Sequence, residues 1–452
     1  MKIVLVDPAP PSKICEPYEH LGLCYLSSCL TREGHYVRII SSVLESLSIS
    51  GIINSILAAK PQLIGFSLKE CFAARAFKII NGIRSRGCNA PVVLGGHYAT
   101  FNQFEILRDF SAVNFIVRGE GEYTLNELAA AIDSGNAFES IAGLSFRRNG
   151  SIMENPERAK IADLDTLPYP DRSQTPQVLQ QGGMIDLSGS RGCYANCSFC
   201  SIQSFYKASA GPNYRQRSVK NIVDEIERLV EKFGRHQFKF IDDQFFAPGN
   251  RGKQQAREFA DELFRRQLKI SFQFSCRVSE ISRDLMAHLK SAGLSRVFIG
   301  VESAHQRGLD TFNKGTTVEQ NRRALDTLDS LGINYIVAMI LTDAFTTWDE
   351  LNQNLSFLDQ LKPRVARVGG MLSVERRLTP HKGTPIFNTL KNMNRLKGNY
   401  KTGYRYVADD VRIRLFLSVW AMLENVCLPV FNYFKMRSKR RKHTLKASFQ
   451  PT

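Results

Sequence analysis

Three cysteines, Cys193, Cys197 and Cys200, constrain this 452-residue chain more than any other feature. Their spacing is Cys-x3-Cys-x2-Cys, and no nearby histidine completes the four-ligand pattern of a structural zinc site. Thiolates this close in sequence converge on one inorganic centre more readily than they form disulfides. Iron–sulfur cubanes normally take four cysteine ligands, so three would leave one iron open to a substrate or cofactor. A structural zinc ion and free thiols are the alternatives.

The motif follows an apolar, strand-like run, and Phe199 precedes its third cysteine. In this it resembles the signature of the radical S-adenosylmethionine (SAM) superfamily. The resemblance implies that the three cysteines are catalytic and hold a 4Fe–4S cluster whose fourth iron is chelated by SAM. It also implies that an electron, from a donor such as a flavodoxin or ferredoxin, cleaves SAM to a 5′-deoxyadenosyl radical. Phe199 matches the family residue that lies near the adenine.

Residues 183–375 repeat apolar runs and helical periods, which is typical of a parallel α/β fold. The predicted strands are 184–187, 238–241, 270–274, 296–300, 335–341 and 366–371. The predicted helices are 219–233, 253–266, 284–291, 318–331 and 347–361. Six such units predict a partial (β/α)6 barrel, whose catalytic groups should lie at the carboxyl ends of the strands.

Polar residues follow several of these strands and match the radical SAM family in order. Asp242 and Asp243 resemble the segment that meets the amino group of SAM. Arg277 resembles a basic residue that pairs with the SAM carboxylate, for which an arginine fork is suited. Glu302 and Ser303 resemble the motif that contacts the ribose and methionine. Each of these matches alone is weak evidence for a SAM site, because an aspartate at a strand end is more often a helix N-cap.

Residues 1–145 also alternate strands and helices. The predicted strands are 2–6, 36–40, 62–67, 92–95 and 114–117, and the predicted helices are 18–33, 49–59, 73–85 and 124–132. This pattern predicts a doubly wound parallel sheet, which binds ligands at the carboxyl ends of its strands. The residues expected at that edge are Ser67, Gly95, Gly96, His97, Thr100, Gly119 and Glu120. Glycines there allow a backbone to approach a ligand closely.

The Gly95-Gly-His97-x-Ala-Thr100 and Gly119-Glu-Gly-Glu122 segments resemble the cobalamin-binding, Rossmann-like domain of class B radical SAM enzymes. The Asp-x-His-x-x-Gly motif that supplies an axial histidine in many cobalamin proteins is absent from this part of the sequence. We therefore expect a cobalamin without a protein histidine on its lower face. The alternatives are a domain that binds no cobalamin and, for His97, a histidine satisfied at a strand–helix turn.

Two segments flank the barrel. Residues 146–182 are predicted to form a linker, with a hairpin around Asn149-Gly150 and an extended stretch around Pro168 and Pro170. Residues 376–452 are predicted to form a helical C-terminal region with a basic tail. Its apolar stretch, 415–434, is interrupted by Glu424, Asn425 and Pro429, so helices capping the barrel are favoured over interfacial attachment to a membrane.

The net charge of +17 is concentrated in part at the C-terminus, where residues 435–452 hold seven Lys/Arg and no acid. A solvated tail is favoured over nucleic-acid binding, which we consider unlikely on charge alone; contact with an anionic membrane surface is a further alternative. The N-terminus does not resemble a signal peptide. We expect a cytoplasmic location, in which the cysteines, ten in all, stay reduced.

Together these features predict a cobalamin-dependent radical SAM enzyme that methylates a small-molecule metabolite. A second hypothesis keeps the fold but replaces methylation by cyclisation, rearrangement or aminocarboxypropyl transfer from SAM. A hypothesis of another class is a cobalamin- or nucleic-acid-binding sensor with a structural cluster.

Overall fold

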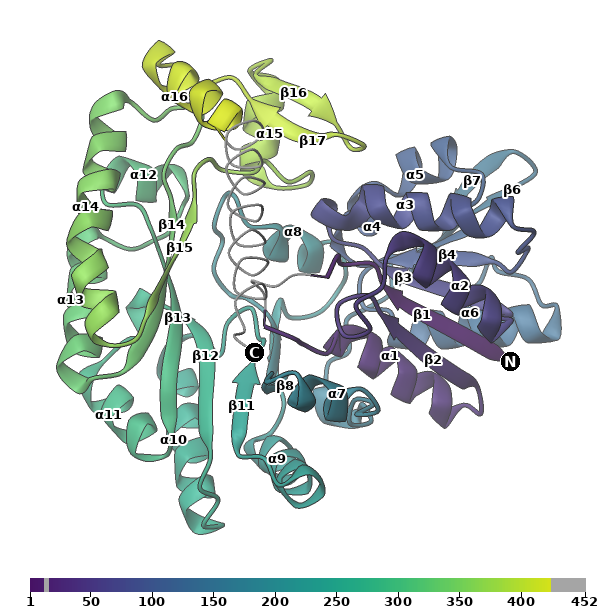
Figure 1. The fold of residues 1–452 in the computed structure, drawn as a ribbon, viewed down its shortest axis with the longest axis horizontal. Helices are drawn as coiled ribbons and strands as arrows, with labels where there is room; N and C mark the ends of the chain where they lie inside the picture. The colour runs from purple at the N-terminus through teal and green to yellow at the C-terminus, as the bar shows by residue number, and fades with distance from the viewer. Residues whose placement is uncertain (12–15, 424–452) are drawn as a thin grey trace, which may run out of the picture.

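The computed structural model describes residues 1–11 and 16–423, whose two large sheets are mainly parallel, and the carboxyl ends of the N-terminal strands point toward the barrel (Figure 1). The N-terminal sheet has the strand order β2-β1-β3-β4-β5-β6-β7. Its strands are β1 Lys2–Asp7, β2 Tyr36–Ser41, β3 Leu63–Ser67, β4 Val92–Gly95, β5 Phe115–Val117, β6 Leu144–Arg148 and β7 Ser151–Glu154. The first five are parallel. The predicted doubly wound sheet is confirmed.

Successive side chains of each strand point to opposite faces of the N-terminal sheet, and each face has its own hydrophobic core. In β1, Val4 and Val6 enter the core beneath α2 and α3, whereas Ile3 and Leu5 enter the core beneath α1 and α6. The helices are α1 Leu21–Arg32, α2 Ile49–Ala59, α3 Glu70–Ser85, α4 His97–Phe101, α5 Gln103–Asp109 and α6 Glu122–Ser134. A sheet covered on both faces needs such apolar strands, which is why their sequences contain few charges.

The hairpin around Asn149 and Gly150 forms as predicted, but it is not part of a linker. Strand β6 pairs antiparallel with β5, and β7 pairs with β6. The N-terminal sheet therefore extends to Glu154, beyond residue 145, where we had placed the end of the domain. Buried Phe146 joins the core that includes Phe115, and this packing holds the hairpin on the sheet.

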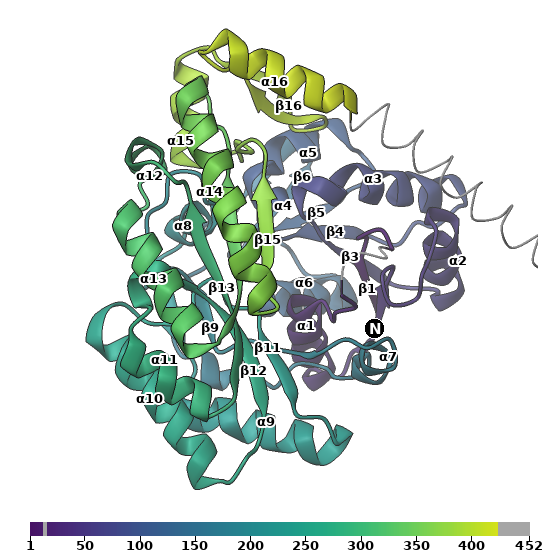
Figure 2. The ribbon, with the colours of Figure 1, turned by 60° about the vertical axis from the view of Figure 1, so that its left-hand side comes forward.

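The second sheet is entirely parallel and has the strand order β15-β14-β13-β12-β11-β8. Its strands are β8 Ile185–Leu187, β11 Gln237–Phe240, β12 Ser271–Arg277, β13 Leu294–Glu302, β14 Asn334–Ile340 and β15 Met371–Glu375. The helices between them are α9 Val219–Phe233, α10 Gly249–Arg265, α11 Arg283–Ser291, α13 Val318–Leu331 and α14 Trp348–Arg367. They cover the outer face of the curved sheet, as Figure 2 shows, and the predicted partial barrel is confirmed.

The prediction of a last barrel strand at 366–371 is wrong. Helix α14 continues through Pro363 to Arg367, and the strand is Met371–Glu375. Leu361 and Val365 are both buried on the barrel, so packing on either side of the proline maintains the helix. Short elements near the cysteines were also missed: α7 Thr175–Gln180, β9 Ser190–Gly192, α8 Ser201–Lys207, β10 Tyr214–Gln216 and α12 Gln306–Thr311.

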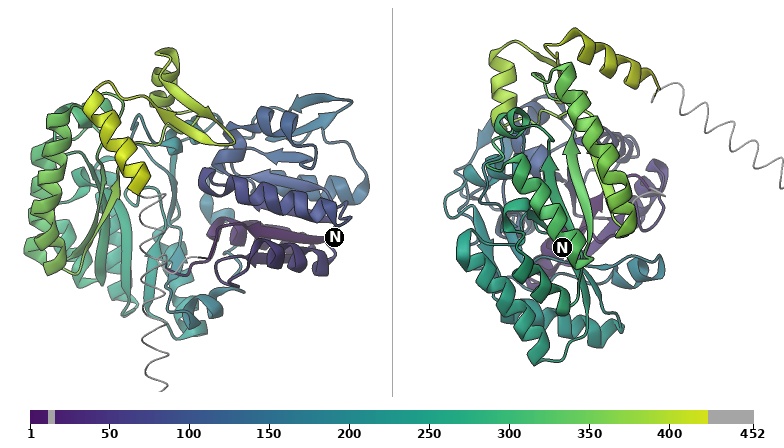
Figure 3. Two further views of the ribbon diagram at one scale, coloured as in Figure 1. Left: turned by 45° about the horizontal axis from the view of Figure 1, so that its top comes forward. Right: turned by 90° about the vertical axis from the view of Figure 1, so that its left-hand side faces the viewer.

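The C-terminal region is only partly helical, which corrects the prediction of a helical cap. It consists of α15 Pro385–Asn392, the hairpin β16 Leu396–Asn399 and β17 Gly403–Tyr406, and α16 Val411–Met422. It lies over one end of the barrel and also reaches the N-terminal domain (Figure 3), where the Tyr98 hydroxyl donates to the Tyr400 carbonyl at 2.6 Å. Among residues 1–11 and 16–423, no helix is long and apolar enough to cross a membrane. The basic tail and residues 424–434 lie outside the described residues.

Candidate functional site

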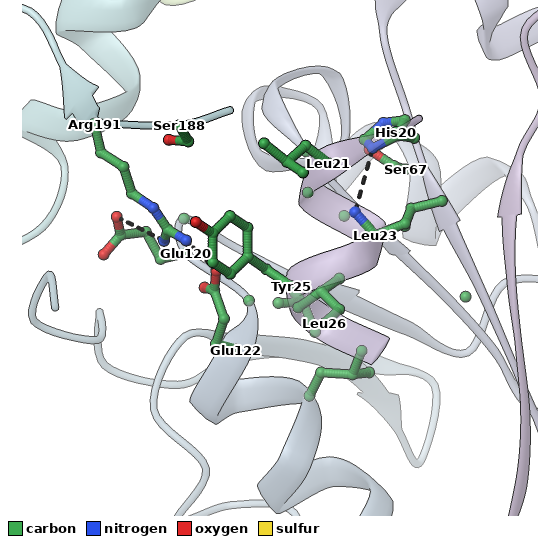
Figure 4. Close-up of a pocket in the computed structure, with 18 of the residues that line it drawn as sticks. His20, Leu21, Leu23, Tyr25, Leu26, Ser67, Glu120, Glu122, Ser188 and Arg191 are labelled. Atoms are coloured by element: carbon green, nitrogen blue, oxygen red, sulfur yellow. Dashed lines mark hydrogen bonds and ion pairs between the residues drawn. The ribbon is translucent and has the colours of Figure 1, made fainter. Parts of the chain in front are cut away.

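A cavity of about 280 Å³ lies between the carboxyl edge of the N-terminal sheet and the entrance of the barrel (Figure 4). Two sets of residues predicted from the sequence line it. Those from the N-terminal sheet are Ser67, Gly95, Gly96, Gly119 and Glu120, and those from the barrel are Asp242 and Asp243. The folded chain therefore brings most of the predicted cobalamin residues and two of the predicted SAM residues into one space.

On the N-terminal side of the cavity, glycine backbone and apolar side chains lie beside a few polar groups such as Glu120 and Glu122. Gly96 has a φ of +88°, and a Cβ atom built on it would lie 3.0 Å from the Leu68 carbonyl oxygen. Gly119 also has a positive φ, +66°. Both the conformation and the space therefore favour glycine at position 96. Leu5, Leu23, Val93, Val117 and Leu125 also line the cavity.

His97 and Thr100 lie at this edge but outside the cavity lining. The His97 ring stacks on Phe205 of α8 with centroids 4.0 Å apart, and its Nδ1 lies 3.2 Å from the Ser201 hydroxyl. Burial lowers the pKa of His97 to about 4, so the ring is neutral. Thr100 accepts a hydrogen bond from the Gly119 amide at 3.3 Å. His97 is thus a domain-contact residue beside the cysteine loop, and Thr100 supports a turn.

Glu120 joins the two domains. Its carboxylate lies 3.3 Å from Arg191 and 2.8 Å from Arg215, and it accepts a hydrogen bond from the Ile161 amide at 2.8 Å. Burial favours the protonated acid, but the Arg215 hydrogen bond and the charges of both arginines lower the pKa of Glu120. Glu122 lies 2.6 Å from Arg191. Figure 4 shows the Arg191 guanidinium against both carboxylates.

Arg191, Arg215, His20 and Tyr25 were not predicted to belong to the site. Arg191 is two residues before Cys193, on β9, and its guanidinium lies 5.3 Å from the centre of the Tyr25 ring. His20 caps α1 by accepting a hydrogen bond from the Leu23 amide at 3.3 Å, and burial lowers its pKa. His20 lay inside the helix predicted at 18–33, so the sequence did not mark it as a cap, and nothing marked the arginines.

The three cysteines lie in the loop between β9 and α8. The Ala195 amide donates to Cys193 Sγ at 3.4 Å, and Arg277 donates to Cys197 Sγ at 3.3 Å. Burial raises the pKa of Cys193 and raises that of Cys200 to about 12. Within the described part of the chain, no three His, Cys, Asp or Glu side chains converge as ligands of a single metal ion would. A cubane places each cysteine on a different iron atom and does not require that convergence.

The two predicted aspartates have different surroundings. Asp242 accepts hydrogen bonds from the Gly189 amide at 2.9 and 3.2 Å, so it supports the turn that leads to the cysteine loop. Burial raises the pKa of Asp242 to about 7 and that of Asp243 to about 6. A cation bound near Asp242 and Asp243 would lower both pKa values and favour the ionised carboxylates.

Two more of the predicted SAM residues, Glu302 and Arg277, contact Lys314, which the sequence left without a role. Lys314 Nζ lies 2.9 Å from the Glu302 carboxylate, and both side chains are buried. Arg277 donates to the Lys314 carbonyl. Glu302 has a φ of +65°, a strained conformation for a residue with a side chain, as is often found at functional sites. The position of Lys314, one residue before Gly315 in a short loop, was the available signal.

Ser303 and Phe199 are placed by packing. The Ser303 hydroxyl donates to the His305 carbonyl at 3.2 Å and is fully buried. Phe199 packs edge-on against Phe312 with centroids 5.3 Å apart. Phe199 lies within the cysteine loop, and Ser303 directly follows β13.

Comparison with known proteins matches both halves. Residues 187–358 match the radical SAM superfamily, and residues 13–129 match the B12 binding domain. An uncharacterized methyltransferase of Pyrococcus horikoshii, PH0819, is 30% identical over 368 residues, which cover 80% of this chain and 78% of that protein. The chain belongs to the cobalamin-binding radical SAM family. It is therefore an enzyme, and the hypothesis of a sensor with a structural cluster is wrong.

Other members of the family are longer. The anaerobic magnesium-protoporphyrin IX monomethyl ester cyclase of Rubrivivax gelatinosus is 29% identical over 352 residues, which cover 74% of this chain and 61% of the cyclase. The structure of OxsB with aqua-cobalamin and SAM bound has the same fold, with a TM-score of 0.77 at 23% identity, over 94% of this chain and 66% of OxsB. This radical SAM chain thus spans two thirds or less of those two proteins.

The cofactors of this radical SAM enzyme are a 4Fe–4S cluster, SAM and cobalamin. The residues present suit them. Three cysteines in one loop form a cubane donor set, and the glycine edge leaves a cradle that a Cβ atom at position 96 would crowd. The match to the radical SAM superfamily, which implies a 4Fe–4S cluster, replaces the zinc and free-thiol alternatives.

Proposed function

We propose that this enzyme transfers a methyl group from SAM to a carbon centre of a small-molecule metabolite. The observation that carries the proposal is the shared cavity, in which the glycine edge of the B12 binding domain faces Asp242, Asp243 and Arg191 of the barrel. The glycine edge of the B12 binding domain lies close to the cysteine loop, and this arrangement suits a reaction that uses ligands of both domains. When bound, the cluster, SAM and cobalamin supply the electron, radical and methyl chemistry that side chains cannot perform.

Named relatives support methyl transfer. Besides the Pyrococcus horikoshii protein, the hopanoid C-3 methylase of Methylococcus capsulatus is 26% identical over 359 residues, 77% of this chain and 66% of that protein. A methylase and a methyltransferase among the similar proteins favour this outcome over other uses of the same cofactors.

We assign the binding roles on the barrel side by charge. Cys193, Cys197 and Cys200 hold the cluster. Arg277, already directed at Cys197, is suited to the SAM carboxylate, because a guanidinium binds a carboxylate through paired hydrogen bonds. Asp243 is suited to the SAM amino group, and Asp242 supports the loop before the cysteines.

The remaining contacts to SAM involve the buried ion pair. Glu302 is suited to the ribose hydroxyls, with Lys314 fixing its carboxylate. Phe199 is suited to the adenine, and Ser303 orients the strand end. On the other side of the cavity, the backbone at Ser67, Gly95, Gly96 and Gly119 is suited to the corrin. His97 is not assigned as an axial ligand, because it is stacked on Phe205.

The test uses enzyme reconstituted anaerobically with iron, sulfide and hydroxocobalamin. It is incubated with methyl-deuterated SAM, a reductant and a small-molecule extract of its source, and mass spectrometry follows the products. We expect formation of 5′-deoxyadenosine and of a product that carries the deuterated methyl group. Replacing the chemical reductant by a flavodoxin or ferredoxin tests the electron donor. SAM that stays intact under all conditions would contradict the proposal.

A second candidate is ring closure, because the anaerobic cyclase of Synechocystis matches 95% of this chain and 85% of its own length at 26% identity. In that case the product would have lost hydrogen and gained no deuterated methyl group. Aminocarboxypropyl transfer would instead add the amino-acid portion of SAM without the label. The three outcomes differ in mass, so one experiment distinguishes them.

A further inference from the structure

Helix α16 (Val411–Met422) is apolar on two opposite faces. Ile413 is fully buried, and Phe416 and Leu417 pack against the barrel core. The opposite face exposes four apolar side chains, which recur at helical spacing: Val411, Leu415, Val419 and Met422, with exposed fractions of 63%, 65%, 46% and 57%. Burial of apolar side chains is favourable on either face of a helix, so the outer face of α16 needs a surface that covers it.

The outer face lies at the edge of the molecule. Figure 2 and the right-hand view of Figure 3 show α16 at the outer edge of the molecule. Trp420 is 39% exposed, and the Arg376 guanidinium lies 5.0 Å from its ring. Aromatic rings with an arginine beside them are typical of helices at a membrane surface.

The charge of the following sequence identifies the covering surface. Residues 435–452 hold seven Lys/Arg and no acid, and they follow α16 after a short, mainly apolar stretch. A cluster of cations next to an apolar helix face binds anionic lipid, and each cation near the surface adds to the affinity. The same cations would repel one another if two copies of the chain met through this face. Nothing in this surface depends on the reaction proposed above.

We propose that the outer face of α16 and the basic tail dock this enzyme on an anionic lipid bilayer. The apolar side chains enter the boundary between headgroups and acyl chains, and the tail binds the charged headgroups. Two weak signals of this kind together give stable but reversible attachment.

The first measurement uses Trp420 as a reporter. The chain has two tryptophans, so a Trp348→Phe background leaves Trp420 alone. The full-length protein in this background is titrated with vesicles of phosphatidylcholine, with and without phosphatidylglycerol. We expect a blue shift of the Trp420 emission and co-sedimentation with the anionic vesicles only, both reduced by high salt.

Variants separate the two parts of the surface. Leu415→Glu should weaken vesicle partitioning by about 10-fold or more, because it replaces an inserted apolar group by a charge. The control is Phe264→Glu, which makes the same kind of change at a 46%-exposed side chain on α10, and should leave binding unchanged. Changing Lys439, Arg440, Arg441 and Lys442 together to glutamine should weaken binding by at least about 100-fold without affecting the folded barrel.

Three results would overturn the proposal. The first is equal binding to neutral and anionic vesicles, or no binding to either. The second is a dimer in light scattering that Leu415→Glu dissociates, which would make the face a contact between two copies. The third is a Trp420 spectrum that is already blue-shifted in buffer and unchanged by vesicles, which would mean that the chain itself covers the face.

Discussion

The two parallel sheets present their carboxyl edges to the same cavity, but they do so with opposite chemistry. The N-terminal edge offers Ser67 and a series of glycines among leucine and valine side chains. The barrel side lines the cavity with Arg191, Asp242 and Asp243, whereas the cysteines and the buried pair of Glu302 with Lys314 are not part of its lining. Fold topology explains why both edges bind ligands. The side chains decide which ligands.

This difference indicates a division of labour. An apolar backbone edge suits a large, planar cofactor that is held by contact area, whereas a charged edge suits a small zwitterion such as SAM and a metal cluster. The only charged bridge that we find between the two edges at this cavity, among the described residues, is Arg191 and Arg215 with Glu120 and Glu122. If the division is real, changes on one edge should leave the ligand of the other in place.

The largest effect is expected at the cysteines. Replacing Cys193, Cys197 and Cys200 by alanine should abolish the cluster and all SAM cleavage, because each cysteine supplies one ligand. Cobalamin binding should persist, since the glycine edge is untouched. Iron and sulfide analysis and visible spectra of the anaerobic protein measure both, with Cys71→Ala, an exposed cysteine, as the control. Full iron and sulfide in the triple variant would show that another set of ligands holds the cluster.

The bridge between the edges comes next. Arg191→Met should lower the unfolding free energy of the metal-free protein by about 3–5 kcal/mol, because it leaves Glu122 buried without its cation. Lys220→Met removes an exposed ion pair with Asp224 and should change stability by about 1 kcal/mol or less. Urea unfolding followed by fluorescence measures both. Equal stability of the two variants would mean that the domains are held together elsewhere.

The SAM contacts are expected to be weaker than the bridge. Glu302→Ala and Arg277→Ala should each weaken SAM binding by about 10- to 150-fold, which corresponds to about 1.5–3 kcal/mol for a charge-assisted contact. Calorimetric titration of the cluster-loaded protein measures the affinity, and Arg283→Ala, a mostly exposed residue on α11, serves as the control. If both variants bind SAM normally, these residues do not belong to its site.

The glycine edge is tested by a small addition. Gly96→Ala should weaken cobalamin binding by about 10-fold, because its Cβ would lie 3.0 Å from the Leu68 carbonyl and disturb the cradle. Gly87 is a matched control: its φ is +81°, and a Cβ atom there meets nothing within 4 Å. Gly87→Ala therefore carries the same conformational strain without the crowding. Equal effects of the two variants would attribute the loss to strain and not to the cradle.

The smallest spectroscopic effect is expected at His97. We expect the lower dimethylbenzimidazole base of bound Co(II) cobalamin to be displaced without a protein nitrogen in its place, so the EPR spectrum should show no nitrogen coupling. His97→Ala should leave the spectrum unchanged, since the ring is stacked on Phe205. Stability should fall by about 1–2 kcal/mol from the lost stacking. Nitrogen coupling that disappears in His97→Ala would make this residue an axial ligand after all.

Much of the fold was predictable because local signals agree with the tertiary structure. Helices Ile49–Ala59, Val219–Phe233 and Val318–Leu331 have the bounds predicted, since capping residues and a following glycine or proline mark them. Helix α14 was misjudged because Pro363 is normally a stop, and packing of Leu361 and Val365 overrides it. Short elements such as β9 and β10 depend on pairing with each other, which the sequence does not reveal.

The sequence by itself determined the cysteine loop, the glycines at the N-terminal edge and the order of polar residues along the barrel, because these depend on residue type and on position after a strand. Only the tertiary structure decided which of them share a cavity. It placed Ser67, Gly96 and Asp243 together, directed His97 to α8, and assigned Glu120 to a bridge with Arg191 and Arg215. Buried ion pairs form between residues distant in sequence, and their geometry depends on how the two sheets meet.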